Sequence, residues 1–498
     1  MRLYTLLFVS FIGLYNTSYA QSTVYTVVDQ TTKLPIPYAT VQTSKNQGVY
    51  ANDEGRFSIS SEEYTKAIDS LYITSMGYEE AKLVLSKITD TIIYLQPKTI
   101  ALEGAFVSNK ALTVDEIIEQ VKDNLEQNYG PTLSQKRFFL RISDLGKVRR
   151  INIDFKKSTI EAFDKKFLDS VVTMLPKKSE FYSEILGDYY KNISDEKLTI
   201  IKAAKLYDKN NQGSIEALGK KVEQIFKENV KPNSYLKIKS GFFFGTKVQV
   251  DSILKVSDDA KQVKTELEKQ DVNKAYVTDQ KETITSLISN TLYDENSKLN
   301  IIHKSGRYDF ELVDYSTINE NSVYVVKFTP GRRADFKGTL YINTQDFAIM
   351  RVDYENTKTL KSFGLLGIDY KENVYKGKTI FSKGKDSKYH IKFLQKYQGN
   401  TFGIDRPLKI IEKNKYVSGK RKQNELSLGI DVGMTHLIKT ELVIYNNAPI
   451  SKTAYQKIKE DYTIEPQYLS KYNPDFWNGY TIMEPNTAIR SFEAKDGL

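Results

Sequence analysis

The chain contains no cysteine, and this absence limits both its covalent chemistry and its cofactors. Disulfide bridges, thiol catalysis and cysteine-ligated zinc or iron–sulfur centres are excluded. An acyl anchor on an N-terminal cysteine is excluded as well. Long hydrophobic runs are also missing, because after residue 20 no stretch approaches the roughly 20 apolar residues that a membrane-spanning helix needs.

Only three histidines are present, which restricts the metal and nucleophile sites that the chain can form. His303, His390 and His436 stand in the contexts HKSG, HIKF and HLIK, and none has the H-E-x-x-H or H-x-x-E spacing of zinc peptidases. The G-x-S-x-G motif of serine hydrolases is missing too. A phosphate-binding loop at Gly377–Thr379 fails because Glu372 occupies the position of its first glycine. We therefore predict no catalytic residue, no metal site and no cofactor.

Lysine and aromatic residues are abundant instead. The net charge is +10, and the chain has 34 tyrosines and 24 phenylalanines. The lysines are scattered rather than grouped in blocks, which favours a solvated surface over a nucleic-acid patch. Tyrosines beside lysines suit a platform for glycans or a slot for acyl chains, although tyrosine is also a common strand residue.

Residues 1–20 have the pattern of a secretory signal peptide. Arg2 precedes an apolar run from Leu3 to Leu14, and Ser18 and Ala20 are the small residues expected before a cleavage site. We expect cleavage after Ala20 and an exported protein, either periplasmic or associated with the outer membrane. Envelope proteins, glycans and lipids are then the expected partners, with peripheral membrane association compatible with the basic surface.

Residues 21–97 predict a β-sandwich. Seven short runs of β-forming residues occur here, separated by turn residues such as Asp29 and Gly77. The segment GVYANDEGRFSI, residues 48–59, places Asn52, Asp53 and Glu54 before a glycine. Because the D-x-[DN]-x-[DN]-G calcium pattern is absent, we interpret this segment as a turn that directs the following strand into the core.

This region resembles the carboxypeptidase-regulatory-like domain, a transthyretin-like or immunoglobulin-like sandwich. The matching elements are Asp29, the segment Leu34–Pro37 before Ala39 and Val41, the turn Asn52–Phe57, and Gly77 with Tyr78. Tyr38 stands where the family often has glycine. The family is common at the N-termini of exported bacterial envelope proteins, and the domain is a non-catalytic accessory module. The resemblance therefore implies no proteolysis.

Residues 98–235 are predicted to be a linker with amphipathic helices. Thr113 and Glu116 form a capping box, and the residues that follow place Ile117, Ile118 and Val121 on one helical stripe. A second helical pattern begins at Ser214.

Residues 236–498 predict an antiparallel β-rich domain with a helical insertion near 256–295. From about Gly306 the hydrophobic period becomes two, which favours a large curved sheet or half-barrel. This region also resembles the C-terminal part of the same exported family and, loosely, periplasmic lipoprotein-carrier half-barrels that shelter an acyl chain. Asp309 and Glu311 are candidates for paired carboxylates, although solvent-facing charge is the alternative.

The sequence as a whole predicts a multi-domain, mainly β protein with some α structure. We expect a non-enzymatic exported cell-envelope protein with a binding or structural role, which holds an amphipathic ligand or a partner in the C-terminal sheet. Two alternatives remain open. One is a periplasmic carrier of lipid, and the other is a glycan-active hydrolase that uses carboxylates on the sheet.

Overall fold

The computed structural model describes residues 23–44, 47–59, 70–98, 112–192, 195–231, 233–240, 244–249, 266–318 and 321–494. The expected signal peptide, residues 1–20, lies outside these ranges. The chain forms two compact units. The first joins Met1–Ala101 to Asn473–Arg490, and the second joins Leu102–Tyr472 to Ser491–Leu498.

The first unit is a sandwich of two sheets. One sheet has the strand order β4-β1-β7 and the other has the order β3-β2-β5-β6, so the predicted seven strands are confirmed. Their inward residues form one core, in which Phe57 and Val27 are fully buried. The strands are β1 (Thr23–Asp29), β2 (Thr40–Ser44), β3 (Gln47–Tyr50), β4 (Arg56–Ile59), β5 (Ser70–Thr74), β6 (Ala81–Val84) and β7 (Ile92–Leu95).

The segment NDEG is a turn, as expected. The Asn52 side-chain oxygen accepts hydrogen bonds from the backbone N–H groups of Glu54 at 2.8 Å and Arg56 at 2.9 Å. Gly55 has φ +71°, and a Cβ at this position would lie 2.6 Å from the carbonyl oxygen of Val27. Glycine is therefore required here, both for its backbone conformation and for the close approach of β1. The turn directs Phe57 into the core.

The C-terminal segment of the first unit adds apolar side chains to it. This segment contains the 3-10 helix η3 (Pro474–Trp477) and the short helix α10 (Thr487–Arg490). Trp477 and Ile489 are buried, and the Asn52 side chain donates to the carbonyl of Pro485 at 3.1 Å. Residues near the end of the sequence thus belong to the first unit and contact its NDEG turn.

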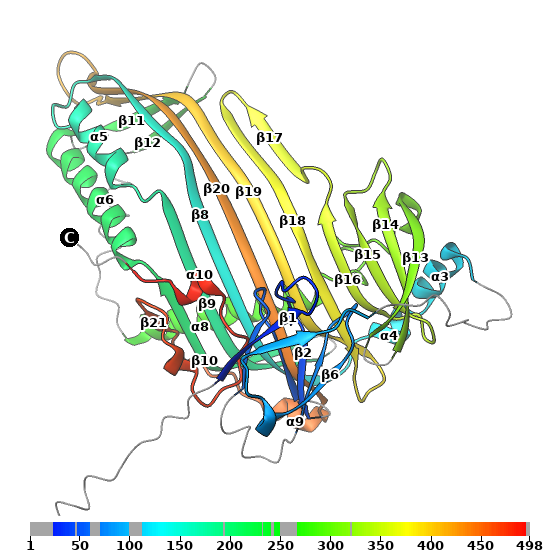
Figure 1. The fold of residues 1–498 in the computed structure, drawn as a ribbon. Coiled ribbons are helices and arrows are strands. Elements are labelled where there is room, and N and C mark those ends of the chain that lie inside the picture. The colour runs from blue at the N-terminus through cyan, green and yellow to red at the C-terminus, as the bar shows by residue number, and fades with distance from the viewer. Residues whose placement is uncertain are drawn as a thin grey trace, which may run out of the picture. The chain divides into compact units, whose positions relative to one another are not determined.

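The second unit is built on one large, mainly antiparallel sheet of 14 strands, which curves as Figure 1 shows. Its main path runs β13-β14-β15-β16-β18-β19-β20-β8-β9-β10-β21. The strands are β8 (Ser134–Ser158), β9 (Lys178–Lys191), β10 (Glu196–Tyr207), β11 (Tyr235–Ser240), β12 (Phe244–Gln249), β13 (Tyr308–Ile318), β14 (Asn321–Pro330), β15 (Phe336–Asn343), β16 (Ile349–Asn356), β17 (Lys361–Leu365), β18 (Ile368–Lys383), β19 (Tyr389–Lys413), β20 (Lys422–Pro449) and β21 (Gln467–Leu469).

The predicted linker over 98–235 is wrong from Ser134 onward, because β8, β9 and β10 are strands of this sheet. The reason is that β8 is buried on both faces near its start, where Phe138, Phe139 and Leu140 are all fully enclosed. A strand covered on both sides shows no alternation of apolar and polar residues, so its period is hidden. The curved antiparallel sheet itself is confirmed.

Helices cover one face of the sheet in two places. The first group comprises α3 (Val114–Asp123), α4 (Leu125–Tyr129) and α8 (Glu266–Ser289), whose buried residues share a core cluster with the strands. The second comprises α5 (Lys165–Met174) and α6 (Lys209–Asn229), which pack near Leu428. The capping box of Thr113 and Glu116 is confirmed at the start of α3.

Helix α8 confirms a helix within the predicted insertion, of which residues 256–265 lie outside the described part. Val277 and Ile284 of this helix are fully buried in the core cluster that it shares with the strands. Among the helices in the described ranges, none combines the length and apolar character needed to cross a membrane. The short helix α9 (Lys452–Lys457) follows β20.

Candidate functional site

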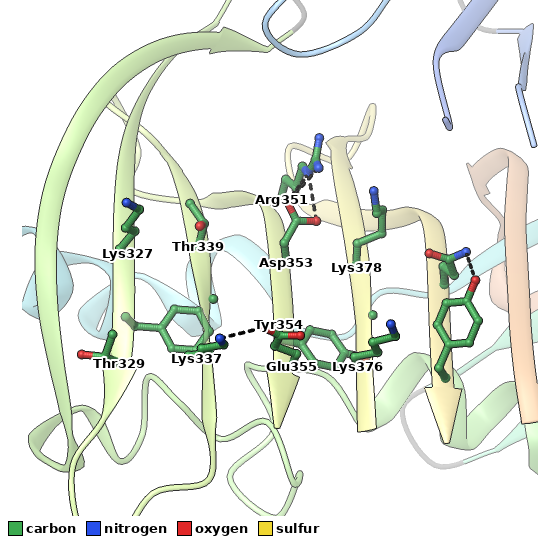
Figure 2. A pocket seen from close by; sticks show the side chains of 15 residues that line it. Lys327, Thr329, Lys337, Thr339, Arg351, Asp353, Tyr354, Glu355, Lys376 and Lys378 are labelled. Atoms are coloured by element: carbon green, nitrogen blue, oxygen red, sulfur yellow. Dashed lines mark hydrogen bonds and ion pairs between the residues drawn. The ribbon is translucent and has the colours of Figure 1, made fainter. Parts of the chain in front are cut away.

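A groove with a volume of about 540 Å³ lies on one face of the second unit's sheet, over β14, β15, β16, β18 and β19. On β14 the side chain of Phe328 joins the core beneath the helices, so its neighbours Lys327 and Thr329 point to the opposite face. The groove is on this second face (Figure 2). We call it the cationic groove, and its lining residues are Lys327, Phe328, Thr329, Lys337, Gly338, Thr339, Arg351, Asp353, Tyr354, Glu355, Lys376, Gly377, Lys378, Gln395 and Tyr397.

The strand registers arrange these side chains in two rows across the sheet. Row one runs through partners on successive strands, in the order Lys327, Thr339, Asp353, Lys378 and Gln395. Row two is parallel to it and runs in the order Lys337, Glu355, Lys376 and Tyr397. Because cross-strand partners and residues two apart share a face, both rows line the same groove, as Figure 2 shows.

Positive charge exceeds negative charge in the groove, with five cationic side chains against two carboxylates. Arg351 forms an ion pair with Asp353 at 2.7 Å, and Lys337 forms one with Glu355 at 3.0 Å. These two pairs use both carboxylates. The remaining basic side chains carry charge that the groove's own acids do not balance.

Three lysines provide this excess charge. Lys327 forms no ion pair within the described part of the chain, and Lys376 lies over the ring of Tyr397, with 5.4 Å from its ammonium to the ring centroid. Burial, and next to it the positive charge of Arg351, lowers the pKa of the Lys378 ammonium, although Asp353 opposes this. An anion in the groove would raise that pKa again, because it would favour the charged form.

The candidate carboxylates Asp309 and Glu311 are exposed on β13 and share a face, as their spacing predicts. In register Asp309 stands opposite Thr329 and Glu311 stands opposite Lys327, so Glu311 extends row one. The carboxylates inside the groove are held by Arg351 and Lys337.

The three histidines lie apart. His303 contacts the carbonyl of Tyr293 at 3.0 Å through Nε2. His390 lies 2.9 Å from Asp386, and His436 lies 2.5 Å from Asp144. In the ranges that the structure describes, no group of three or more metal-ligating side chains comes together.

The segment Gly377–Thr379, which lacks the first glycine of a phosphate-binding loop, lies within β18. It is a strand, and its Lys378 side chain lines the cationic groove. The groove was not predicted from the sequence. A signal was nevertheless present, because basic residues recur with the period of a strand in Lys376-Gly377-Lys378 and charged residues do so from Arg351 to Glu355.

A second feature lies on the other face of the sheet, toward its far end. Cross-strand partners there form two apolar rows, which we call the apolar band: Phe363, Tyr370, Phe402, Met434 and Val148 in the first row, and Leu365, Ile368, Ile404, Val432 and Ile151 in the second. Phe363 is 52% exposed and Met434 is 42% exposed. Contiguous rows of large, exposed apolar side chains are typical of surfaces that bind a protein, a membrane or an apolar ligand.

The band lies between the two helix-covered regions. Strand β19 keeps a regular register through this part of the sheet, so Leu394, Phe402 and Leu408 share one face. Leu394 belongs to the core cluster under α3, α4 and α8, and Leu408 packs against the cluster of α5 and α6. The described helices therefore cover the sheet on either side of the band.

Comparison with known proteins gives no family assignment. No family model matches the chain, and no curated protein matches it. A domain of an outer-membrane lipoprotein-sorting protein from Vibrio parahaemolyticus is 8% identical, and the match covers 69% of this chain and 98% of that domain with a TM-score of 0.20. The MucA/MucB complex of Pseudomonas aeruginosa matches at 7% identity, with coverage of 68% and 98% and a TM-score of 0.16. Likeness at this level carries no argument about ligand or partner.

Proposed function

We propose that the protein is a non-enzymatic binding protein of the cell envelope that holds an acidic glycan in its cationic groove. The observation that carries this proposal is the convergence of five basic side chains and two acids in a groove of about 540 Å³ on a rigid sheet. The N-terminal pattern supports export. The first unit, with seven strands in two sheets, is then a carboxypeptidase-regulatory-like accessory domain.

The shape and chemistry of the groove favour an extended, hydroxyl-rich anion. Side chains on one face of a sheet recur about every 7 Å along a strand and about every 5 Å across strands. The groove therefore presents its charges as a flat array and not in a single deep pocket. Thr339 adds a neutral hydroxyl to row one, and Tyr397 closes row two with an aromatic ring beside the Lys376 ammonium. An acidic polysaccharide meets all three features.

The test is a titration of the purified chain with oligogalacturonate as the acidic probe and neutral dextran as the comparison. The variant K327Q/K376Q/K378Q removes three of the five basic side chains that line the groove. The matched control K156Q/K165Q/K166Q removes the same charge from exposed lysines outside it. We expect salt-sensitive binding of the acidic probe, a loss of roughly 10-fold or more in the groove variant, and little change in the control.

Two results would overturn this proposal. One is an equal loss of affinity in both variants, which would mean that net charge and not the groove binds the glycan. The other is turnover of a glycan or peptide that groove substitutions abolish, which would make the protein an enzyme.

The apolar band favours a second candidate function, which is carriage of an amphipathic lipid. Phe402 and Met434 are exposed cross-strand partners in this band. An acyl chain that covered them would remove their apolar surface from water, which favours binding. Native mass spectrometry of protein isolated from its own envelope should then show bound acyl species, and the variant F402D/M434D should lose them. Spectra without bound lipid from the unmodified protein would reject this candidate.

A further inference from the structure

A second, smaller cavity lies at the end of the sheet where β14 turns into β15. Its volume is about 270 Å³, and its wall combines the loop before β13, the turn between β14 and β15, and the start of β17. Five of its side chains are cationic, and Asp335 is the one carboxylate among them. The basic residues are Lys298, Lys304, Arg307, Arg333 and Lys361.

Most of this positive charge has no internal partner. Asp335 is engaged by Lys358 at 3.1 Å, and Lys298 is engaged by Glu372 at 2.5 Å. The other four cations, Lys304, Arg307, Arg333 and Lys361, form no ion pair with any residue in the described ranges. Like charges held around one small cavity repel one another, and an anionic ligand would remove that repulsion.

The backbone holds the two arginines in place. The 3-10 helix η2 (Ser305–Arg307) carries Arg307, and the N–H of Gly331 donates to the Arg307 carbonyl at 2.9 Å. The N–H of Ala334 then donates to the Gly331 carbonyl at 3.1 Å, which closes the turn that carries Arg333. A Cβ on Gly331 would lie 2.8 Å from the Arg307 carbonyl oxygen, so only glycine allows this approach.

We propose that this cavity binds a tetrahedral oxyanion, the phosphate group of a monoester. Guanidinium groups donate pairs of parallel N–H bonds that match the oxygens of such groups, and two arginines with adjacent lysines suit a dianion better than a single carboxylate. The volume of about 270 Å³ is below the range of roughly 300–1,000 Å³ for drug-sized ligands. A head group fits this space, whereas an extended polymer does not.

The site is separate from the cationic groove. Phe336 lines the small cavity, and Lys337, the next residue of β15, lines the groove. The two sites share no lining residue. Substitutions in one are not expected to change the other.

The test uses the full chain and three probes: inorganic phosphate, glucose 6-phosphate, and phosphatidylcholine vesicles with and without phosphatidic acid. The variant R307Q/R333Q removes both guanidinium groups. The control R149Q/R332Q removes two exposed arginines that do not line the cavity. We expect the first variant to weaken phosphate binding by roughly 10-fold or more, and the control to retain it.

Gly331→Ala gives an independent test, because it changes no charge. Displacing the turn from η2 should weaken phosphate binding while unfolding by circular dichroism stays cooperative. Binding of the two soluble probes would identify a free phosphate or phosphosugar as the source, and binding of phosphatidic acid vesicles alone would identify a lipid head group. The proposal is overturned if the unmodified chain binds none of the probes, or if R307Q/R333Q and its control lose affinity equally. The K327Q/K376Q/K378Q variant should bind phosphate normally, so failure of the groove proposal leaves this one standing.

Discussion

The side-chain amide of Asn52 donates a hydrogen bond to the carbonyl of Pro485, a residue 433 positions further along the chain. The same turn offers the Glu54 carboxylate to the backbone N–H of Thr487 at 2.9 Å, and Arg56 donates to the Thr487 hydroxyl at 2.8 Å. The turn that reverses the chain in the sandwich is thus also the place where the C-terminal segment binds. Local turn chemistry and long-range assembly use the same side chains.

Asn52→Ala should therefore release the C-terminal segment as well as weaken the turn. Asn52 is 1% exposed and loses two accepted bonds and one donated bond on truncation, so we expect a cost of about 2–3 kcal/mol. Trp477 is the only tryptophan of the chain and is buried in this segment. Its fluorescence should shift to the red in the variant at lower denaturant concentrations than in the unmodified protein.

Asp90→Ala is the matched control, because Asp90 caps an exposed turn in the same unit by accepting from the N–H of Ile92. We expect this substitution to leave the tryptophan transition almost unchanged. Equal shifts from the two variants would show that the Asn52 contact to Pro485 adds nothing to the turn itself.

The sandwich could be predicted from the sequence because its determinants are local. Turn residues such as Gly55 and Gly77 recur at short intervals, and Phe57 alternates with polar neighbours. Each strand can therefore be recognised from its own residues. The C-terminal segment could not be placed, because its partners Asn52 and Glu54 are chosen by the tertiary fold. Nothing within the segment itself indicates them.

The cationic groove could not be predicted for a related reason. Lys327 and Lys378 each look like ordinary solvent-facing residues of an alternating strand. They meet because the registers of four strands place Thr339 and Asp353 between them in one row. Register depends on which strands are neighbours, and a single sequence does not state this.

Row one of the groove continues into the interior of the sheet. Gln395 is paired in register with Glu441, Glu441 with Arg141, and Arg141 with Glu184. The Arg141 Nε lies 2.7 Å from the Glu184 carboxylate, and both side chains are 1% exposed. Polar side chains that line an open groove at one end of the row are thus enclosed at the other end.

Arg141→Met should destabilise the second unit by about 3–5 kcal/mol, because it leaves the Glu184 carboxylate buried without its cation. The double variant R141M/E184M should recover most of this loss, since it replaces a buried charged pair with apolar side chains of similar size. Urea unfolding of the three proteins measures both effects. A double variant as unstable as R141M would contradict the explanation by unpaired charge.

Lys392 on β19 provides a prediction about pH. Burial lowers the pKa of its ammonium from 10.5 to about 8, and its Nζ donates to the carbonyl of Tyr445 at 2.9 Å. Between pH 8 and 10.5 the unfolded chain binds more protons at this residue than the folded chain, so the free energy of unfolding contributed by Lys392 rises with pH across this window. Below pH 8 the ammonium is charged in both states, and the full cost of burying it is present.

Lys392→Met should consequently stabilise the protein at pH 7 by on the order of 1–3 kcal/mol, because it removes a buried charge at the expense of one hydrogen bond. The advantage should shrink as the pH rises from 8 and should be lost near pH 10.5, where the unmodified lysine is neutral in the fold. Urea unfolding of both proteins at pH 7, 8.5 and 10 measures this difference, and Lys385→Met at an exposed position serves as the control. A difference between Lys392→Met and the unmodified chain that stays constant with pH would show that the ammonium is solvated in the folded protein, and that the water near β19 reaches further into the sheet than its packing indicates.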